Sequence, residues 1–149
     1  MALEQQVQKD IMAAMKAKDQ VRLNAVRSIK SAILLAKTAE GASGELTDGD
    51  IVKLIQKLAK QRKEAAEQYV AAGRQELADN ELAEAEVLGG YLPKQLSPEE
   101  LEAKLREIVA EVGASAPSDM GKVMGVATKR LAGLADGKAI SAVVRRILA

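Results

Sequence analysis

Apolar residues recur every three or four positions along most of the chain, which is the spacing of one face of an α-helix. The first such stretch covers residues 3–16, with its apolar positions four residues apart: Leu3, Val7, Ile11 and Met15. The second covers residues 20–39, and its apolar side chains surround much of the helix: Val21, Leu23, Val26, Ile29, Ile33 and Leu34. We therefore expect this second helix to be the most buried.

Start and stop signals delimit two further helices in the first half of the chain. Thr47 is placed as an N-cap, with Asp50 at the third helical position to complete a capping box. This helix is predicted to run to about residue 72 and to end at Gly73, because glycine favours a helix end. A shorter helical stretch or a pair of them, residues 74–88, precedes Gly89 and Gly90.

The segment YLPKQLSPEEL, residues 91–101, is the predicted boundary between two domains. Pro93 interrupts a helix, because it lacks an N–H donor and restricts the residue before it. A new helix is then predicted at Ser97, with Pro98 at the first position and Glu100 completing a capping box. It is predicted to end at Gly113, and the two domains are predicted to span residues 1–92 and 93–149.

Two more helices are predicted after Gly113. The first carries two internal glycines and is capped by Ser118 or Asp119, and the second starts at Asp136. The composition favours the same fold class, because Ala, Leu, Glu, Lys and Gln are abundant and Phe and Trp are absent from the 149 residues. We predict an all-α protein with a helical N-terminal domain of about four helices and a small three-helix C-terminal domain.

The residue types exclude several kinds of site. The chain has no Cys and no His, which removes Ser-His-Asp and Cys-His catalysis, Cys/His zinc sites and an imidazole base. Neither GxxxxGK[ST] nor GxGxxG is present. The carboxylates Glu81, Glu84 and Glu86 are interpreted as a solvated acidic helix face. We predict no catalytic residue, no cofactor and no metal, although an enzyme that uses only Lys, Asp and Glu is left open.

No stretch reads as a secretion signal or a membrane span, because no apolar run reaches about 18 residues. The absence of Cys fits a reducing compartment. We therefore expect a cytoplasmic protein that does not bind membranes.

Positive charge is concentrated in residues 118–148, which hold six basic side chains and two acidic ones. With about 100° per residue, Gly121, Lys122, Gly125 and Lys129 share one face, opposite the apolar residues. A glycine inside a helix costs about 1 kcal/mol relative to alanine. Close approach of a ligand to the backbone, or of a neighbouring helix, would explain two of them, and Gly121 could instead only loosen the first turn of the helix.

This basic region predicts binding of a folded RNA through its phosphates. Few aromatic side chains are available for base stacking, which disfavours recognition of single strands. The proposed RNA-binding residues are Gly121, Lys122, Gly125, Lys129, Arg130, Lys138, Arg145 and Arg146. The alternative is a protein interaction module in which a partner helix docks on the glycine-bearing face.

Three motifs in order, YLPKQLS, MGKVMG and ADGK, resemble the GatB/YqeY family. Residues 118–148 are similar to the tail domain found in the B subunit of the glutamine-dependent aminoacyl-tRNA amidotransferase. The first half resembles the stand-alone YqeY-like members, for example in AMKAKDQVRLNAVRSIKSAI. The resemblance implies a helical N-terminal domain joined to a three-helix tail.

The resemblance also implies tRNA binding at the positions that match the tail: Gly121, Lys122, Gly125, Lys129 and Lys138. An amidotransferase or another translation protein is the implied protein partner. The catalytic domain of the amidotransferase has no counterpart in this chain. A carbon–nitrogen ligase activity with glutamine as amido-N-donor therefore applies by family association only, and we expect no intrinsic activity.

Overall fold

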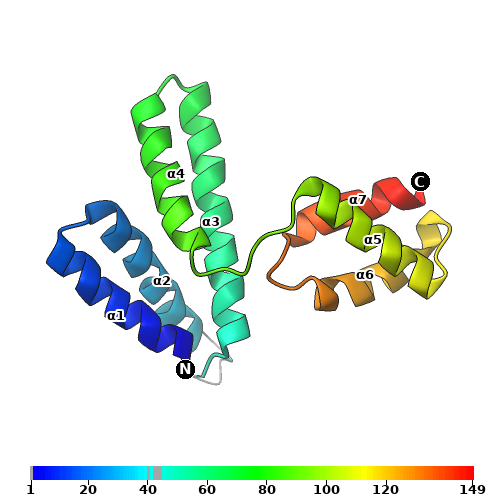
Figure 1. The fold of residues 1–149 in the computed structure, drawn as a ribbon, viewed down its shortest axis with the longest axis horizontal. Helices are drawn as coiled ribbons and strands as arrows, with labels where there is room; N and C mark the ends of the chain where they lie inside the picture. The colour runs from blue at the N-terminus through cyan, green and yellow to red at the C-terminus, as the bar shows by residue number, and fades with distance from the viewer. Residues whose placement is uncertain (1, 40, 42–44) are drawn as a thin grey trace. The chain divides into compact units, whose positions relative to one another are not determined.

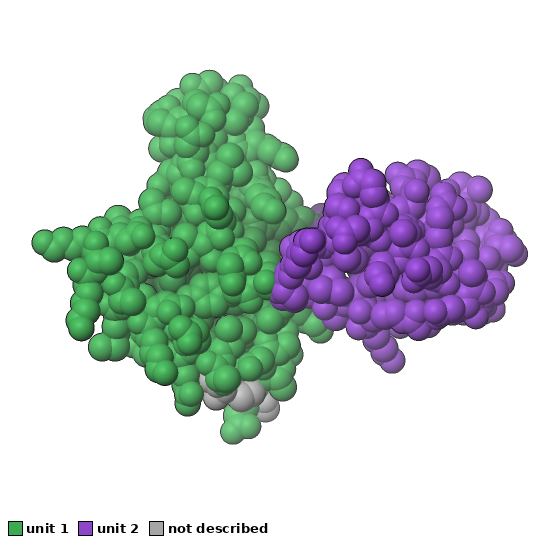
Figure 2. Space-filling model, viewed as in Figure 1, with its two compact units in different colours: residues 1–92 green, residues 93–149 purple. Residues whose placement is uncertain are grey.

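The computed structural model describes residues 2–39, 41 and 45–149 (Figure 1). In these residues it contains seven α-helices, one short 3₁₀ turn and no strand, which confirms the all-α fold. The chain divides into two compact units, residues 1–92 and residues 93–149 (Figure 2).

The first unit consists of four helices, with α2 in contact with each of the other three. α1 lies beside α2, and α3 and α4 form a long antiparallel hairpin (Figure 1). The bounds of the helices are Ala2–Ala17 for α1, Gln20–Thr38 for α2, Asp48–Ala71 for α3 and Gln75–Gly89 for α4.

α2 contributes more buried side chains than any other helix of this unit, as its sequence predicted: Leu23, Ala25, Val26, Ile29 and Ile33. The prediction was wrong for Leu34, whose relative exposure is 53%. Its neighbour Leu35 is 74% exposed. Both lie at the C-terminal end of α2, on the side of the helix opposite Ile29.

A partly buried ion pair joins α3 to α4, and it corrects the interpretation of the α4 carboxylates. Glu84 is only 6% exposed, and its Oε1 lies 3.5 Å from Nη2 of Arg62. Asn80 also donates a hydrogen bond to Glu84 at 2.8 Å. Glu81 is half-buried beside the same arginine, whereas Glu86 is exposed. A carboxylate loses its hydration when it is buried, so a cation and hydrogen-bond donors are needed there.

The second unit packs three helices around an aliphatic core: α5 (Pro98–Val112), α6 (Met120–Arg130) and α7 (Gly137–Leu148). A 3₁₀ turn, η1 (Pro117–Asp119), leads into α6. The backbone N–H of Leu96 donates to the carbonyl of Leu134 at 2.9 Å, and this bond ties the segment before α5 to the loop after α6. The buried core residues are Leu101, Leu105, Ile108, Val123, Ala127, Leu131, Ile140, Val144 and Leu148.

Two capping boxes begin helices, where the sequence predicted them. At α3, Thr47 Oγ1 accepts from the Asp50 N–H at 3.1 Å, and Asp50 Oδ2 accepts from the Thr47 N–H at 3.0 Å. At α5, Ser97 and Glu100 exchange the same pair of bonds at 3.1 and 3.2 Å. These bonds satisfy N–H groups that have no partner inside the helix.

The capping box of α5 gives a testable prediction of stability. Ser97→Ala removes one cap bond and should lower the free energy of unfolding of the second unit by about 1 kcal/mol. Native-state hydrogen exchange of the amides in α5, α6 and α7 measures this loss. Ser118→Ala is the matched control, because Ser118 is exposed and its side chain forms no hydrogen bond with any described residue.

The hydrogen bond from the Ser97 N–H to the Glu100 carboxylate should stabilise the second unit only when that carboxyl is ionised. The Ser97 N–H hydrogen bond lowers the pKa of Glu100 below its ordinary value of 4.5. A carboxyl with a lowered pKa stabilises the fold above its unfolded pKa, and this effect is lost as the pH falls through the folded pKa. Glu100→Gln should therefore destabilise the second unit at pH 7, and the difference from the wild type should shrink below about pH 4.5. A difference that stays constant down to pH 2 would contradict this assignment.

Candidate nucleic-acid interface of the second unit

α6 buries one face and exposes the other. Val123 and Ala127 are completely buried against α5 and α7, and Leu131 just after the helix is 2% exposed. The opposite face is exposed and carries the four residues selected from the helical wheel: Gly121, Lys122, Gly125 and Lys129. This arrangement follows from the spacing of the apolar positions. The Val, Ala and Leu side chains lie on one face of the helix, and only that face can be buried in the core.

The two glycines of α6 border open space. A Cβ atom added to Gly121 or to Gly125 would meet no atom within 4 Å. Close packing of a neighbouring helix therefore does not explain either glycine. Neither backbone angle lies in the left-handed region, so conformation does not require glycine here. The glycines leave an exposed stretch of backbone that another molecule could approach closely, and Gly121 also lies in the first turn, where it could loosen the helix start.

Four exposed basic side chains form no ion pair with any residue that the structure describes: Lys122, Lys129, Lys138 and Arg145. We call them the four unpaired cations. Within α6 the two lysines are seven residues apart, and within α7 Lys138 and Arg145 have the same spacing. Seven residues are nearly two turns, so each pair shares a side of its helix with about 10 Å along the axis between its members.

The other two predicted RNA-binding arginines are engaged by glutamates of α5. Arg130 Nη1 lies 2.7 Å from Glu111 Oε2. Arg146 pairs with Glu102, which also lies 3.7 Å from Arg106. Exposed pairs of this kind contribute at most about 1 kcal/mol to stability. They do, however, offset the charge of both arginines, so these two differ from the four unpaired cations.

α5 supplies most of the negative charge of the second unit. It carries five glutamates against Lys104 and Arg106, whereas residues 114–149 carry six basic side chains against Asp119 and Asp136. The near-neutral total of the chain thus hides a separation of charge between helices. The sequence contained both sets of residues, but it gave no signal that Glu102 and Glu111 would reach arginines of other helices.

The start of α6 differs from the predicted cap. Neither Ser118 nor Asp119 forms a side-chain cap on this helix. Instead Asp119 Oδ2 accepts hydrogen bonds from the N–H groups of Ser115 at 3.0 Å and Ala116 at 3.2 Å. These bonds lower the pKa of the Asp119 carboxyl, and nearby Lys122 adds to the effect. The η1 turn continues directly into α6, so the carboxylate orders the preceding loop and not the helix end.

The described residues contain neither a metal-binding cluster nor a membrane-spanning helix. Within the described residues no three acidic side chains gather as a metal ion would require. The helices described are all too short or too polar to cross a bilayer.

Known proteins resemble this chain over most of its length. A family described as Yqey-like protein matches residues 4–148. Three fungal proteins named "Altered inheritance of mitochondria protein 41, mitochondrial" are also similar. The protein of Lachancea thermotolerans is 31% identical over 114 residues, which cover 75% of this chain and 60% of the relative. That of Pyrenophora tritici-repentis is 34% identical over 79% of this chain and 67% of the relative, and that of Meyerozyma guilliermondii is 31% identical over 80% and 64%. The chain thus spans roughly three fifths to two thirds of the length of these relatives.

The open glycine face gives a prediction about stability alone. Gly125→Ala adds a methyl group that meets no atom, and alanine is favoured over glycine inside a helix. The substitution should raise the free energy of unfolding of the second unit by about 0.5 to 1 kcal/mol. Native-state hydrogen exchange of the α6 amides measures the gain. A loss of stability would show that the site is more crowded than the structure indicates.

Proposed function

This chain belongs to the Yqey-like protein family, and on that premise we propose that its second unit binds a structured RNA, with tRNA as the first RNA to test. The proposed contact surface is the outer side of α6 and α7. The proposed contacts are phosphate contacts from the four unpaired cations, with the backbone at Gly121 and Gly125 close to the RNA.

One observation carries this proposal: four exposed cations form no ion pair with any described residue, whereas the other two arginines of α6 and α7 each form one. A side chain without an ion pair is available to a phosphate, and no pair has to be broken first. The open glycines Gly121 and Gly125 share the exposed face of α6 with Lys122 and Lys129, and they support the same surface because they let the RNA backbone approach the helix.

The composition of the second unit favours shape recognition over base reading. Residues 93–149 contain no Phe, Trp or Tyr, so this unit has no aromatic ring on which bases could stack. Recognition of a folded RNA rests mainly on phosphates and on the shape of its backbone. A tRNA offers such a surface.

The finer part of the proposal is an accessory role in tRNA-dependent amidation, with an amidotransferase or another translation protein as partner. No covalent step is assigned to this chain, and purified protein with glutamine, ATP and mischarged tRNA should give no amidated product. A cytoplasmic location is also part of the proposal. The word "mitochondrial" in the name of the fungal relatives describes those proteins.

The dependence of tRNA affinity on salt tests the four unpaired cations. Each phosphate contact contributes about 0.7 to 0.9 to the slope of log K against log salt, so four contacts predict a slope of about −2.8 to −3.6. Lys122→Ala with Lys129→Ala removes two contacts and should reduce the slope to about −1.5. Filter binding of tRNA at salt concentrations from about 50 to about 200 mM measures both slopes.

A matched control separates this surface from general attraction by basic residues. Lys9→Ala with Lys63→Ala removes two exposed lysines of the first unit and should leave the slope unchanged. A Lys122→Ala, Lys129→Ala protein with wild-type affinity and slope would refute the site. Binding of a partner protein to the glycine-bearing face, with little dependence on salt, would favour the alternative of a protein interaction module.

A substitution at Gly125 can distinguish an effect on the stability of the second unit from an effect on tRNA binding. Gly125→Gln places a side chain of several atoms where the RNA backbone is proposed to approach, in space that the folded unit leaves open. Binding of tRNA should weaken about tenfold while the second unit remains folded, because the substitution creates no internal clash. Circular dichroism and filter binding on the same samples measure both. Tight tRNA binding by a folded Gly125→Gln protein would remove the glycines from the interface.

A further inference from the structure

The end of α2 carries two adjacent leucines on the surface of the first unit. Leu34 is 53% exposed and Leu35 is 74% exposed, and Leu35 is the most exposed large apolar residue in the described part of the chain. A leucine left in water gives up the free energy that burial of its side chain would contribute. Single exposed apolar residues are common, but adjacent ones beside hollows with apolar side chains in their lining indicate an interaction surface.

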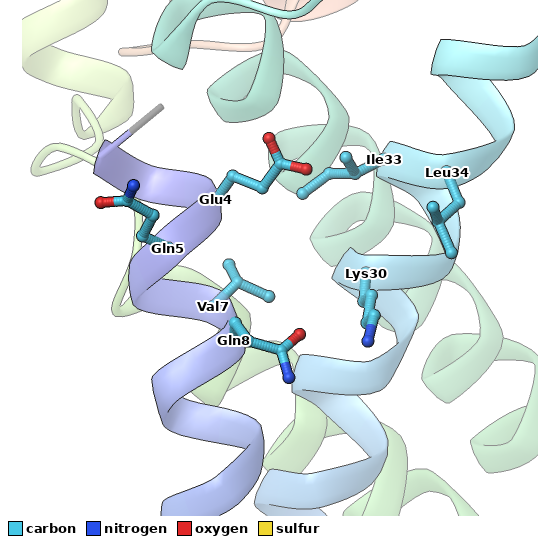
Figure 3. Close-up of a pocket in the computed structure, with 7 residues that line it drawn as sticks. All are labelled: Glu4, Gln5, Val7, Gln8, Lys30, Ile33 and Leu34. Atoms are coloured by element: carbon cyan, nitrogen blue, oxygen red, sulfur yellow. The ribbon is translucent and has the colours of Figure 1, made fainter.

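Each leucine borders its own hollow. Leu34 lines a cavity of about 330 Å³ between α1 and α2, in which Val7 and Ile33 point between the two helices (Figure 3). Leu35 lines a cavity of about 420 Å³ between α2 and α3. The second cavity is the more apolar one, and the other apolar side chains that line it are Ala32, Ala36, Ala39, Leu54 and Leu58. The two leucines therefore form a ridge between two hollows, and we call the whole surface the leucine ridge.

The charges around the leucine ridge are positive. Lys30 borders the first hollow and Lys57 borders the second, and both are exposed. Neither forms an ion pair with a described residue. Lys53 lies one turn before Lys57 on α3 and is also exposed. Among the described residues, Glu4 is the one acidic side chain that lines either hollow, and its carboxylate is paired with Lys37 at 2.5 Å.

We propose that the leucine ridge binds an amphipathic helix of a partner protein, a helix with acidic residues along the edges of its apolar face. Its apolar side chains would enter the two hollows beside Leu34 and Leu35, in the way that helices bind grooves. Its carboxylates would pair with Lys30 and Lys57. This surface lies on the first unit, and the inference does not depend on the RNA proposal.

The charges and the leucines argue for this occupant over two others. A second copy of the chain would bring the same cationic edge against itself, and like charges across an interface oppose association. A nucleic acid would match the lysines but would gain nothing from the leucines and the apolar hollows. An acidic amphipathic helix matches both features.

A helical peptide library displayed on phage tests the inference, with the full chain as bait. The peptides have leucine fixed at i, i+4, i+7 and i+11 and random residues at the flanking positions. Selection on the wild type, with counter-selection on Leu35→Asp, should enrich Glu and Asp at the edges. Synthetic copies of the selected peptides should bind the Leu35→Asp protein at least tenfold more weakly by fluorescence anisotropy. Leu82→Asp on α4 is the matched control, since Leu82 is 46% exposed, lines neither hollow and should leave binding unchanged.

Charge reversal at Lys57 tests the proposed ion pairs directly. Lys57→Glu should weaken the acidic peptide several-fold, and a peptide with Lys in place of Glu at the facing edge should regain affinity for that variant. Lys122→Ala with Lys129→Ala should bind the peptide as the wild type does, which separates this surface from the proposed RNA site.

Three results would overturn the inference. The first is an absence of acidic enrichment, or equal binding of selected peptides to the wild type and to Leu35→Asp. The second is dimerisation of the wild type that Leu35→Asp abolishes in sedimentation, which would make a second copy the occupant. The third is displacement of the peptide by tRNA together with loss of tRNA binding in Leu35→Asp, which would assign the ridge to RNA. Circular dichroism should show Leu35→Asp folded, because its side chain projects into solvent.

Discussion

The second unit depends on one constraint: each of its helices has a single apolar face, and the core contains only aliphatic side chains. Val123 and Ala127 of α6 and Val144 of α7 are completely buried, so every charged residue of those two helices has to lie outside. Small aliphatic side chains allow helices to pack closely and leave no room to bury a lysine. The cationic outer surface is therefore a consequence of how the core is filled.

The same packing divides the basic residues of this unit into two groups. α5 is the acidic helix, and its Glu102 and Glu111 reach Arg146 and Arg130 on the adjacent helices. The remaining cations of α6 and α7 lie out of reach of those carboxylates. The pairs are exposed and contribute little to stability, so their main effect is on where positive charge stays available. A surface of this kind attracts anions while the net charge of the chain is only +1.

The first unit is packed differently, because its helix α2 contacts three other helices. Five of its side chains are buried against those helices, and the exposed residues at its C-terminal end include two leucines. Burial also explains Glu84, which lies on the α3 side of α4 and is accompanied by Arg62 and Asn80. The two units thus present different surfaces, one cationic and polar, the other apolar with cationic edges. Different partners are the natural expectation for two such surfaces.

Local signals in the sequence determined the helices, their starts at Thr47 and Ser97 and the outward face of α6, because caps and helical faces depend on residues three or four positions apart. Ion pairs between helices depend on packing that no local pattern encodes: Arg130 and Glu111 are 19 residues apart, and Arg146 and Glu102 are 44 apart. Only the tertiary structure showed that these two arginines are paired, that the Asp119 carboxylate binds the loop before α6, and that Leu34 lies in solvent. In each case the neighbouring segment in the folded chain decides whether a side chain is paired, buried or exposed. A helical wheel of one segment does not contain that information.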